Sequence, residues 1–122
     1  MMVYVGIDVG RTGALAYIVD GRPNQAGVVD LGDSPVSQAM KIAAKCHELR
    51  ENAEILVGLE RVTSRPKQGV ASTFTFGTFY GAVLGALAVL GVPFELLRPQ
   101  DWRRGVFGAL RGARDKKELS RE

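Results

Sequence analysis

Two acidic residues stand where an apolar strand is expected to end, and carboxylates in that position can bind metal ions. Asp8 follows the apolar residues 5–7, and Glu60 follows the apolar residues 56–59. A carboxylate at the end of a buried strand loses solvation unless a cation compensates for it. If the two strands are neighbours, both carboxylates meet at one edge of the sheet, where they suit a hard ion such as Mg²⁺. Two such ions, on the order of 4 Å apart, activate water and stabilise the leaving oxygen of a phosphodiester.

The same spacing is also compatible with a purely structural role for the two acids. Each carboxylate could cap the turn that follows its strand, or pair with a neighbouring cation, Arg11 or Arg61. The residue types therefore leave a metal site and a structural role open.

Basic residues gather in two parts of the chain, although the net charge is only +3. Residues 61–68 contain three basic side chains and no acidic one. Residues 98–122 carry eight basic side chains against four acidic ones. Clusters of this kind attract polyanions, while a solubilising surface is the competing interpretation.

The predicted elements run in the order strand, strand, strand, helix, strand, helix, strand and helix. Their ranges are 3–8, 14–19 and 25–31 for the first strands, 36–52 for a helix, 55–59 for a strand, 70–90 for a long helix, 92–97 for a strand, 100–104 for a helical turn and 115–121 for a last helix. Three strands feeding alternating helix and strand predict an α/β fold with a mixed five-stranded sheet flanked by helices.

Local signals refine these boundaries. Asp20-Gly21 is typical of a tight hairpin, and Ser34 or Ser37 suits the N-cap of the first helix. Pro66 marks residues 63–69 as a loop. The helical spacing of apolar residues predicts that the first helix buries Val36, Ala39, Met40, Ala43, Ala44 and Leu49.

Several motifs together resemble one known family. They are Gly6-Ile7-Asp8-Val9-Gly10 with the following 12–16, Glu60 with Gln68-Gly69-Val70-Ala71-Ser72 and Phe74-x-Phe76-Gly77, Pro99-Gln100-x-Trp102-Arg103, and Asp115-Lys116-Lys117-Glu118. The chain is similar along nearly its whole length to the RuvC-like Holliday junction resolvases of the RNase H-like superfamily, especially the small resolvases of bacteriophages. The first motif alone is weak, whereas the combination is specific.

The resemblance implies a structure-selective endodeoxyribonuclease that uses Mg²⁺ or Mn²⁺, two ions per active site, with Asp8 and Glu60 as catalytic metal ligands. The family completes this site with further carboxylates, or with a histidine and a carboxylate, from a closing helix that typically reads Asp-Gly-Arg-x-(Asp/Glu)-Ala. No such motif occurs before Glu122, and Asp115 and Glu118 align better with an earlier helix. We therefore expect residues 1–122 to form a single RNase H-like nuclease domain without the C-terminal catalytic helix, its remaining acids lying beyond Glu122.

Branched DNA is the partner that this resemblance implies. Phosphate contacts from basic side chains near Glu60 would supply affinity without sequence information. Phe74 is the aromatic that we expect to contact DNA, with packing in the core as the alternative for Phe74 and Phe76. Trp102 is expected to pack and His47 to lie at the surface. The predicted DNA-binding residues are Arg61, Arg65, Lys67, Gln68, Phe74, Arg103, Arg104, Lys116 and Lys117.

Three glycines at four-residue spacing, Gly77, Gly81 and Gly85, form a ridge on the long helix. Such a ridge permits close helix approach, at a helix-propensity cost of roughly 1 kcal/mol per glycine. The glycines could let the helix lie tight on the sheet. The resemblance favours a homodimer interface instead, because a junction has two strands to cut symmetrically.

Three alternative functions are kept. The opening Gly-x-Asp-x-Gly-x-Thr-Gly also resembles the phosphate-binding hairpin of actin-like ATPases and sugar kinases, but those proteins need a duplicated domain several times this length. A non-catalytic module of the same fold that binds branched nucleic acid is the second. An RNA nuclease similar to the YqgF type is the third.

Bulk features point to a cytoplasmic protein, in the host cytoplasm if the chain is phage-encoded. The single cysteine, Cys46, is expected to be a buried, reduced thiol. No basic region precedes the first strand, so we expect no signal peptide. The longest apolar tract, 80–94, is short and rich in glycine. We therefore expect no membrane span, and no feature calls for an organic cofactor.

Overall fold

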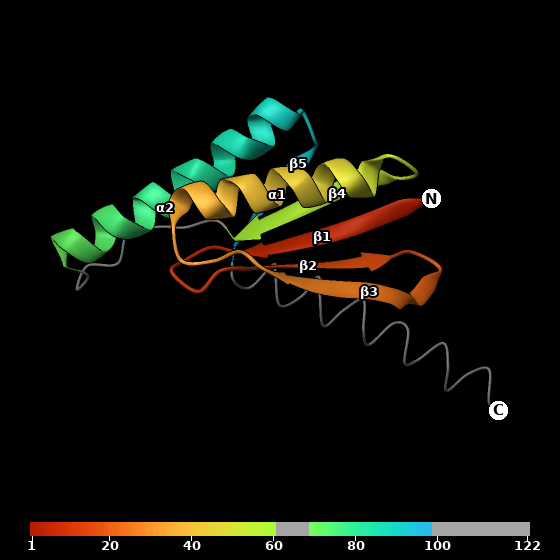
Figure 1. The fold of residues 1–122 in the computed structure, drawn as a ribbon, viewed down its shortest axis with the longest axis horizontal. Helices are drawn as coiled ribbons and strands as arrows, with labels where there is room; N and C mark the ends of the chain where they lie inside the picture. Colours follow the sequence, from red (N-terminus) through yellow and green to blue (C-terminus); the bar gives the residue numbers. More distant parts are fainter. Residues whose placement is uncertain (61–68, 99–122) are drawn as a thin grey trace.

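The computed structural model describes residues 1–60 and 69–98, which form five strands and two helices. In chain order these are β1 (Met2–Asp8), β2 (Ala14–Val19), β3 (Arg22–Asp30), α1 (Pro35–Arg50), β4 (Glu54–Glu60), α2 (Val70–Leu90) and β5 (Phe94–Leu97). Figure 1 shows both helices on the same side of the sheet. The helical turn predicted at 100–104, the helix predicted at 115–121 and most of the loop predicted at 63–69 lie outside the described residues.

The five strands form one mixed sheet in the order β3-β2-β1-β4-β5. β1, β2 and β3 form an antiparallel meander, whereas β4 pairs parallel with β1, and β5 pairs parallel with β4. The predicted α/β class with a mixed five-stranded sheet is therefore confirmed. β1 and β4 lie side by side at its centre, and both run in the same direction.

The core lies between the sheet and the two helices. Alternate residues of the central strands face the helices and are buried: Val3, Val5 and Ile7 of β1, and Ile55, Val57 and Leu59 of β4. Val83 and Leu87 of α2 pack against the same cluster. Because side chains alternate along a strand, the remaining residues of each strand point to the other side. We call that side the outer face of the sheet.

The predicted buried face of α1 is wrong for Val36, Met40 and Ala44, which are exposed, but Leu49 packs against the core as predicted. Val36 and Met40 are 68% and 67% exposed, and the helix buries Gln38, Ile42 and Cys46 instead. The buried face of α1 is thus rotated about the helix axis away from the face that the apolar residues predicted. The reason is that the polar side chain of Gln38 finds hydrogen-bond partners in the interior, so its burial carries little cost.

Local chemistry explains where the elements begin and end. The Ser34 side chain accepts a hydrogen bond from Ser37 N at 3.1 Å and so caps α1, which settles the choice between the two serines. α2 has the predicted bounds and ends at Gly91, whose φ of +70° is left-handed. β5 begins two residues later than predicted because Pro93 has no N–H to give to the ladder.

β3 begins at Arg22, three residues earlier than predicted. Asp20 and Gly21 form a two-residue hairpin loop, with Gly21 at a φ of +77°, so pairing resumes at once between Val19 and Arg22. Pro23 is compatible with this strand because β3 lies at the edge of the sheet.

Candidate functional site

Asp8 and Glu60 end the two central strands of the sheet at the same height. The parallel register pairs Gly6 with Gly58 and Ile7 with Leu59, so the two acids follow at equivalent positions. Ile7 and Leu59 face the core, and both acids therefore point to the outer face, where both are exposed. Neighbouring strands lie about 4.8 Å apart, which brings the two carboxylates within reach of one ion. The parallel register of β1 and β4 thus accounts for the predicted convergence of the two carboxylates at one edge of the sheet.

The structure removes one competing interpretation of Asp8. Within residues 1–60 and 69–98 the only ion pair joins Lys45 to Glu48, at 3.3 Å, so Asp8 does not pair with Arg11. Its side chain also accepts no hydrogen bond from any described residue, which argues against a turn-capping role. The pairing of Glu60 with Arg61 lies outside the described residues.

A third carboxylate, Asp30, shares the row but serves the backbone. The antiparallel registers place Asp8 beside Ala14 and Ala14 beside Asp30, so Asp30 lies two strands, or about 10 Å, from Asp8. Its Oδ1 accepts a hydrogen bond from Gly32 N at 2.8 Å, which shapes the turn that leads into α1. Asp30 therefore belongs to this turn and not to the pair formed by Asp8 and Glu60.

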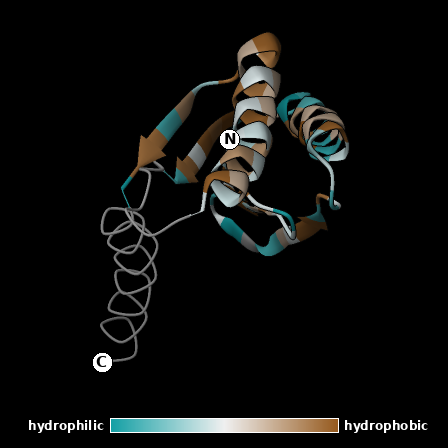
Figure 2. Cartoon of the chain, turned by 90° about the vertical axis from the view of Figure 1, so that its left-hand side faces the viewer, coloured by the Kyte–Doolittle hydropathy of each residue, from teal (hydrophilic) through white to brown (hydrophobic). Residues whose placement is uncertain are grey.

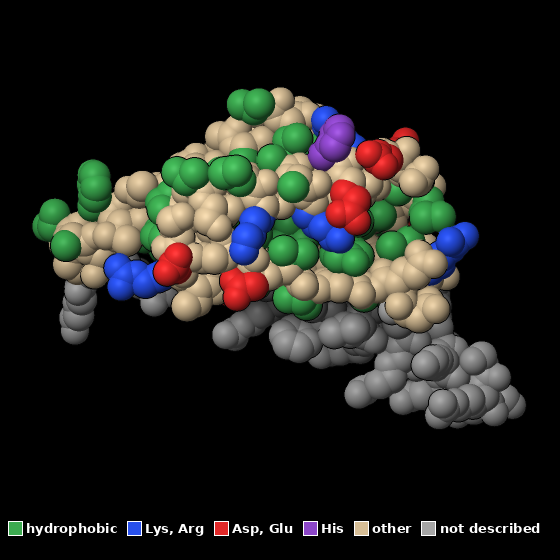
Figure 3. All heavy atoms as spheres, in the orientation of Figure 1, with side chains coloured by type: hydrophobic (Ala, Val, Ile, Leu, Met, Phe, Trp, Pro, Cys, Tyr) green, Lys and Arg blue, Asp and Glu red, His purple; other side chains and the backbone are tan. Residues whose placement is uncertain are grey.

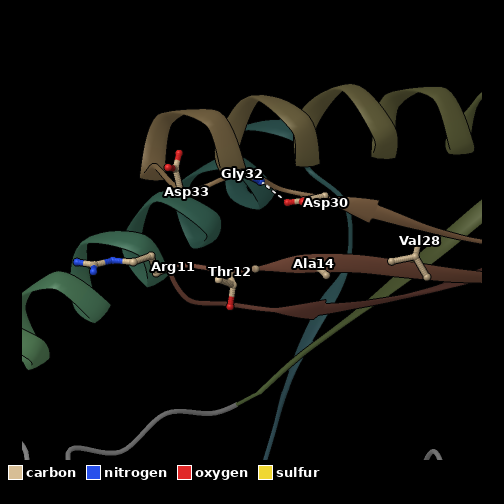
Figure 4. Close-up of a pocket in the computed structure, with 8 residues that line it drawn as sticks. Arg11, Thr12, Ala14, Val28, Asp30, Gly32 and Asp33 are labelled. Atoms are coloured by element: carbon tan, nitrogen blue, oxygen red, sulfur yellow. Dashed lines mark hydrogen bonds between the residues drawn. The ribbon is translucent and has the colours of Figure 1, made fainter.

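A pocket of about 460 Å³ opens beside the turn that follows Asp8. It lies between the β1–β2 turn and the loop before α1, with Arg11 at one end and Val28 at the other (Figure 4). Thr12 and Asp33 also line it. No local sequence pattern predicts this pocket, because its two walls come from segments separated by β2 and β3.

The donor set of the candidate site fits a hard divalent cation in part. Asp8 and Glu60 offer carboxylate oxygens, the ligands that Mg²⁺ and Mn²⁺ prefer. Among the described residues no group of three His, Cys, Asp or Glu side chains surrounds a common point. The described residues could thus offer two ligands to such an ion, and further ligands would have to come from elsewhere.

The middle of α2 is hydrogen-bonded to the end of β4. The hydroxyl of Tyr80 donates a hydrogen bond to the main-chain carbonyl of Glu60 at 3.1 Å, and Phe76 stacks on Tyr80 at 6.0 Å between ring centroids. Phe76 is half-buried, whereas Phe74 is 76% exposed. Packing in the core is therefore wrong for Phe74, whose ring is exposed to solvent.

The other predicted DNA contacts lie outside the described residues, as does Trp102. These contacts are Arg61, Arg65, Lys67, Gln68, Arg103, Arg104, Lys116 and Lys117. His47 is exposed, as predicted. Cys46 is fully buried, also as predicted, and burial raises the pKa of its thiol from 9.0 to about 11, with the charge of Arg50 opposing the shift.

The glycine ridge of α2 faces away from the rest of the described chain. Gly77, Gly81 and Gly85 are exposed, and a Cβ added at any of them would meet no described atom within 4 Å. The idea that these glycines let α2 lie tight on the sheet is therefore wrong. The helix buries Phe79, Val83 and Leu87 on its opposite face.

α2 carries no charged residue, and much of its surface is apolar. Val70 and Val89 are exposed together with Phe74, and Figure 3 shows exposed hydrophobic side chains along the helical side of the molecule. Figure 2 shows α2 in brown and white, whereas α1 also carries hydrophilic teal. By length and composition alone α2 could cross a membrane, although the helix packs one face into the core of this domain.

Comparison with known proteins identifies the fold. No protein-family model and no curated protein sequence matches this chain. The structure of T. thermophilus RuvC in complex with Holliday junction substrate is similar, with a TM-score of 0.58 and 24% identity, over 85% of this chain and 69% of that chain. A second Thermus thermophilus RuvC structure gives a TM-score of 0.52 and 25% identity, over 84% and 68%. With its mixed sheet and two helices on one side, the chain has the RNase H-like fold of the RuvC resolvases.

Proposed function

We propose that this protein is a metal-dependent endonuclease that cleaves branched DNA, four-way junctions above all. The observation that carries the proposal is the equal register of Asp8 and Glu60 at the ends of adjacent parallel strands. Among the described residues, neither carboxylate has an ion-pair partner that would give it a structural task. Their placement in a fold shared with a RuvC that was solved on Holliday junction substrate supports a nuclease.

Asp8 and Glu60 would hold Mg²⁺ or Mn²⁺, two ions when the ligand set is complete. When bound, such ions supply a water nucleophile at neutral pH and neutralise the charge that develops on the leaving oxygen. The part of the protein described here contributes carboxylate oxygens on a fixed strand edge. A sheet holds these oxygens in place better than a loop does, and geometry matters because a 1 Å misplacement costs roughly 100-fold in rate.

The DNA would approach across the outer face, over the strand ends that carry Asp8 and Glu60. Arg61, Arg65 and Lys67 follow Glu60 directly in the sequence, where they could contact the phosphates beside the cleaved bond. Exposed Phe74, on the helix that Tyr80 fastens to Glu60, suits stacking on an unpaired base at a branch point.

We further propose a homodimer through the glycine ridge of α2. A helix that exposes Gly77, Gly81 and Gly85 with no charge along its length can lie close to a copy of itself. A two-fold dimer presents two equivalent active sites in matched orientation, as the two symmetric cuts of a junction require.

The first test compares cleavage of a labelled four-way junction with that of a matched linear duplex. Reactions contain Mg²⁺, Mn²⁺ or EDTA, and both the 122-residue chain and any longer native form are assayed. We expect metal-dependent paired nicks near the branch and little cutting of the duplex, with the longer form more active.

Two other outcomes would redirect the assignment. Tight junction binding without cleavage by either form would favour a non-catalytic branched-DNA module, an alternative consistent with the two ligands found among the described residues. Preferential cutting of an equivalent RNA would favour an RNA nuclease of the same fold.

A further inference from the structure

Gln38 is the only buried polar side chain among the described residues. It lies in the first turn of α1 and is fully buried. Its Nε2 donates hydrogen bonds to the main-chain carbonyls of Gly10 and Gly32, the second at 2.9 Å. An amide buried without partners would be costly, so these two bonds fix where the side chain can sit.

The two carbonyls belong to different loops at the end of the sheet that carries Asp8. Gly10 lies in the turn that follows Asp8, and Gly32 lies in the loop between β3 and α1. One further hydrogen bond joins the same segments, from Leu31 N to Gly13 O at 3.0 Å. Gln38 therefore connects α1, the Asp8 turn and the loop before α1 through a single nitrogen.

The contact extends to the main chain of Asp8 itself. A Cβ added at Gly13 would lie 2.8 Å from Asp8 O and 3.0 Å from Gln38 Nε2. Gly13 is thus wedged between the Gln38 amide and the residue whose carboxylate forms the candidate site. There is thus no room for a side chain at this position, so a shift of the amide would press on the main chain of the turn.

We infer that Gln38 is a positioning residue, which fixes the Asp8 turn and through it the carboxylate of Asp8. This inference rests on the proposed function for its catalytic consequence. Gln38 points into the interior and touches no substrate, so it acts through the main chain of the turn. Since Oε1 accepts no hydrogen bond from the described residues, the donating Nε2 carries the effect.

The test replaces Gln38 with Met in the full chain, which keeps the side-chain length and removes both donated bonds. Ile42→Val is the matched control, because Ile42 lies one turn further along α1, is equally buried and packs into the core. Kinetics on the four-way junction give kcat and KM, and amide hydrogen exchange reports on the turn. Gln38→Leu, which is also uncharged and lacks Nε2, serves as a second variant if Gln38→Met folds poorly.

We expect Gln38→Met to lower kcat at least tenfold, while KM changes by less than twofold. Exchange at the amides of Gly13 and Leu31 should become at least tenfold faster than in Ile42→Val, with amides paired between β1 and β4 unchanged. A kcat equal to that of Ile42→Val, or a loss that merely follows the folded fraction, would overturn the catalytic part of the inference.

Failure of the proposed function can be told apart from failure of this inference. If the wild-type chain does not cleave junctions, the proposed function falls, and exchange at Gly13 and Leu31 then decides whether Gln38 holds the turn. Unchanged exchange in both Gln38 variants would refute that role whatever the activity.

Discussion

At the scale of single residues, the register of two strands decides which acids can work together. Asp8, Glu60 and Asp30 all end strands and lie in one row on the outer face. Within residues 1–60 and 69–98, only the Asp30 side chain accepts a hydrogen bond that accounts for it, the one from Gly32 N. The three side chains all carry a carboxylate, but the backbone around each carboxylate gives it a different role.

The substitution Asp8→Asn tests this difference directly. Loss of one carboxylate ligand should reduce junction cleavage at least about 100-fold, since even indirect metal ligands are worth 10–100-fold. Junction binding should persist or tighten, because a negative charge beside phosphate is removed. Gel-shift and cleavage assays in parallel measure both effects.

Asp30→Asn is the matched control, because asparagine keeps the oxygen that accepts from Gly32 N. This variant should cleave within a few-fold of the wild type. Equal cleavage by Asp8→Asn and the wild type would end the nuclease proposal.

The thiol of Cys46 provides a second prediction at this scale. Burial raises the pKa of this thiol from 9.0 to about 11, so the thiol is neutral below pH 9. The same burial keeps the thiol away from reagents in the folded protein. Iodoacetamide should not label it in the folded protein at pH 8 and should label it fully in denaturant. As pH rises from 9 towards 11 the unfolded thiol ionises first, so this residue's contribution to stability falls over that window. Rapid labelling under native conditions would contradict the burial.

At the scale of elements, α2 is unusual because one face builds the core while the other exposes glycines. A surface glycine within a helix costs roughly 1 kcal/mol relative to alanine, and this helix carries three. No contact within the described residues offsets this loss of helix stability, because a Cβ at any of the three glycines would meet no described atom within 4 Å. A partner that needs close approach to the helix backbone would account for it.

Variants at Gly81 separate folding from dimerisation. Gly81→Ala should raise the stability of the monomer by up to about 1 kcal/mol, because its Cβ meets no described atom. Gly81→Arg should leave the fold intact and abolish the dimer. Thermal unfolding measures the first effect, and size exclusion with light scattering at tens of micromolar measures the second.

Ala44→Arg is the control, because Ala44 is an exposed residue of α1, and this variant should leave the oligomeric state unchanged. A wild-type chain that is monomeric under these conditions would exclude the dimer. If α2 instead inserts into a membrane, the wild type will need detergent to stay in solution. Gly81→Arg will then need detergent as well.

At the scale of the whole molecule, the sheet separates a helical side from an outer face that carries the acids. Basic residues cluster at 61–68 and 98–122, so electrostatic attraction to a polyanion should dominate binding. The affinity for a four-way junction should therefore fall at least about 100-fold between 50 and 200 mM salt.

The slope of this salt dependence shows whether a single basic residue contacts a phosphate. Arg61→Ala should reduce the slope of log K against log salt by about one, as loss of one phosphate contact does. Lys45→Ala should leave the slope unchanged, since Lys45 pairs with Glu48 and lies over the Tyr17 ring on the helical side. A slope that responds equally to both variants would refute a localised DNA-binding surface.

The elements, and the types of residue that end them, could be predicted from the amino-acid sequence alone. Hydrophobic runs and turn residues are local signals, and they predicted α2 at 70–90, the Asp20-Gly21 hairpin and the two strand-ending acids with little error. Alternation of element types then predicted the mixed sheet. These inferences succeeded because each depends on neighbours within a few residues along the chain.

Only the tertiary structure decided which side of each element meets which partner. The buried face of α1 was predicted wrongly, since burial of Gln38 depends on carbonyls in two loops that no local pattern reveals. The same holds for the separation of Asp30 from the acidic pair, for the exposure of Phe74 and for the outward ridge of α2. In each case the free energy depends on contacts between segments distant in sequence, and only the folded sheet brings those segments together.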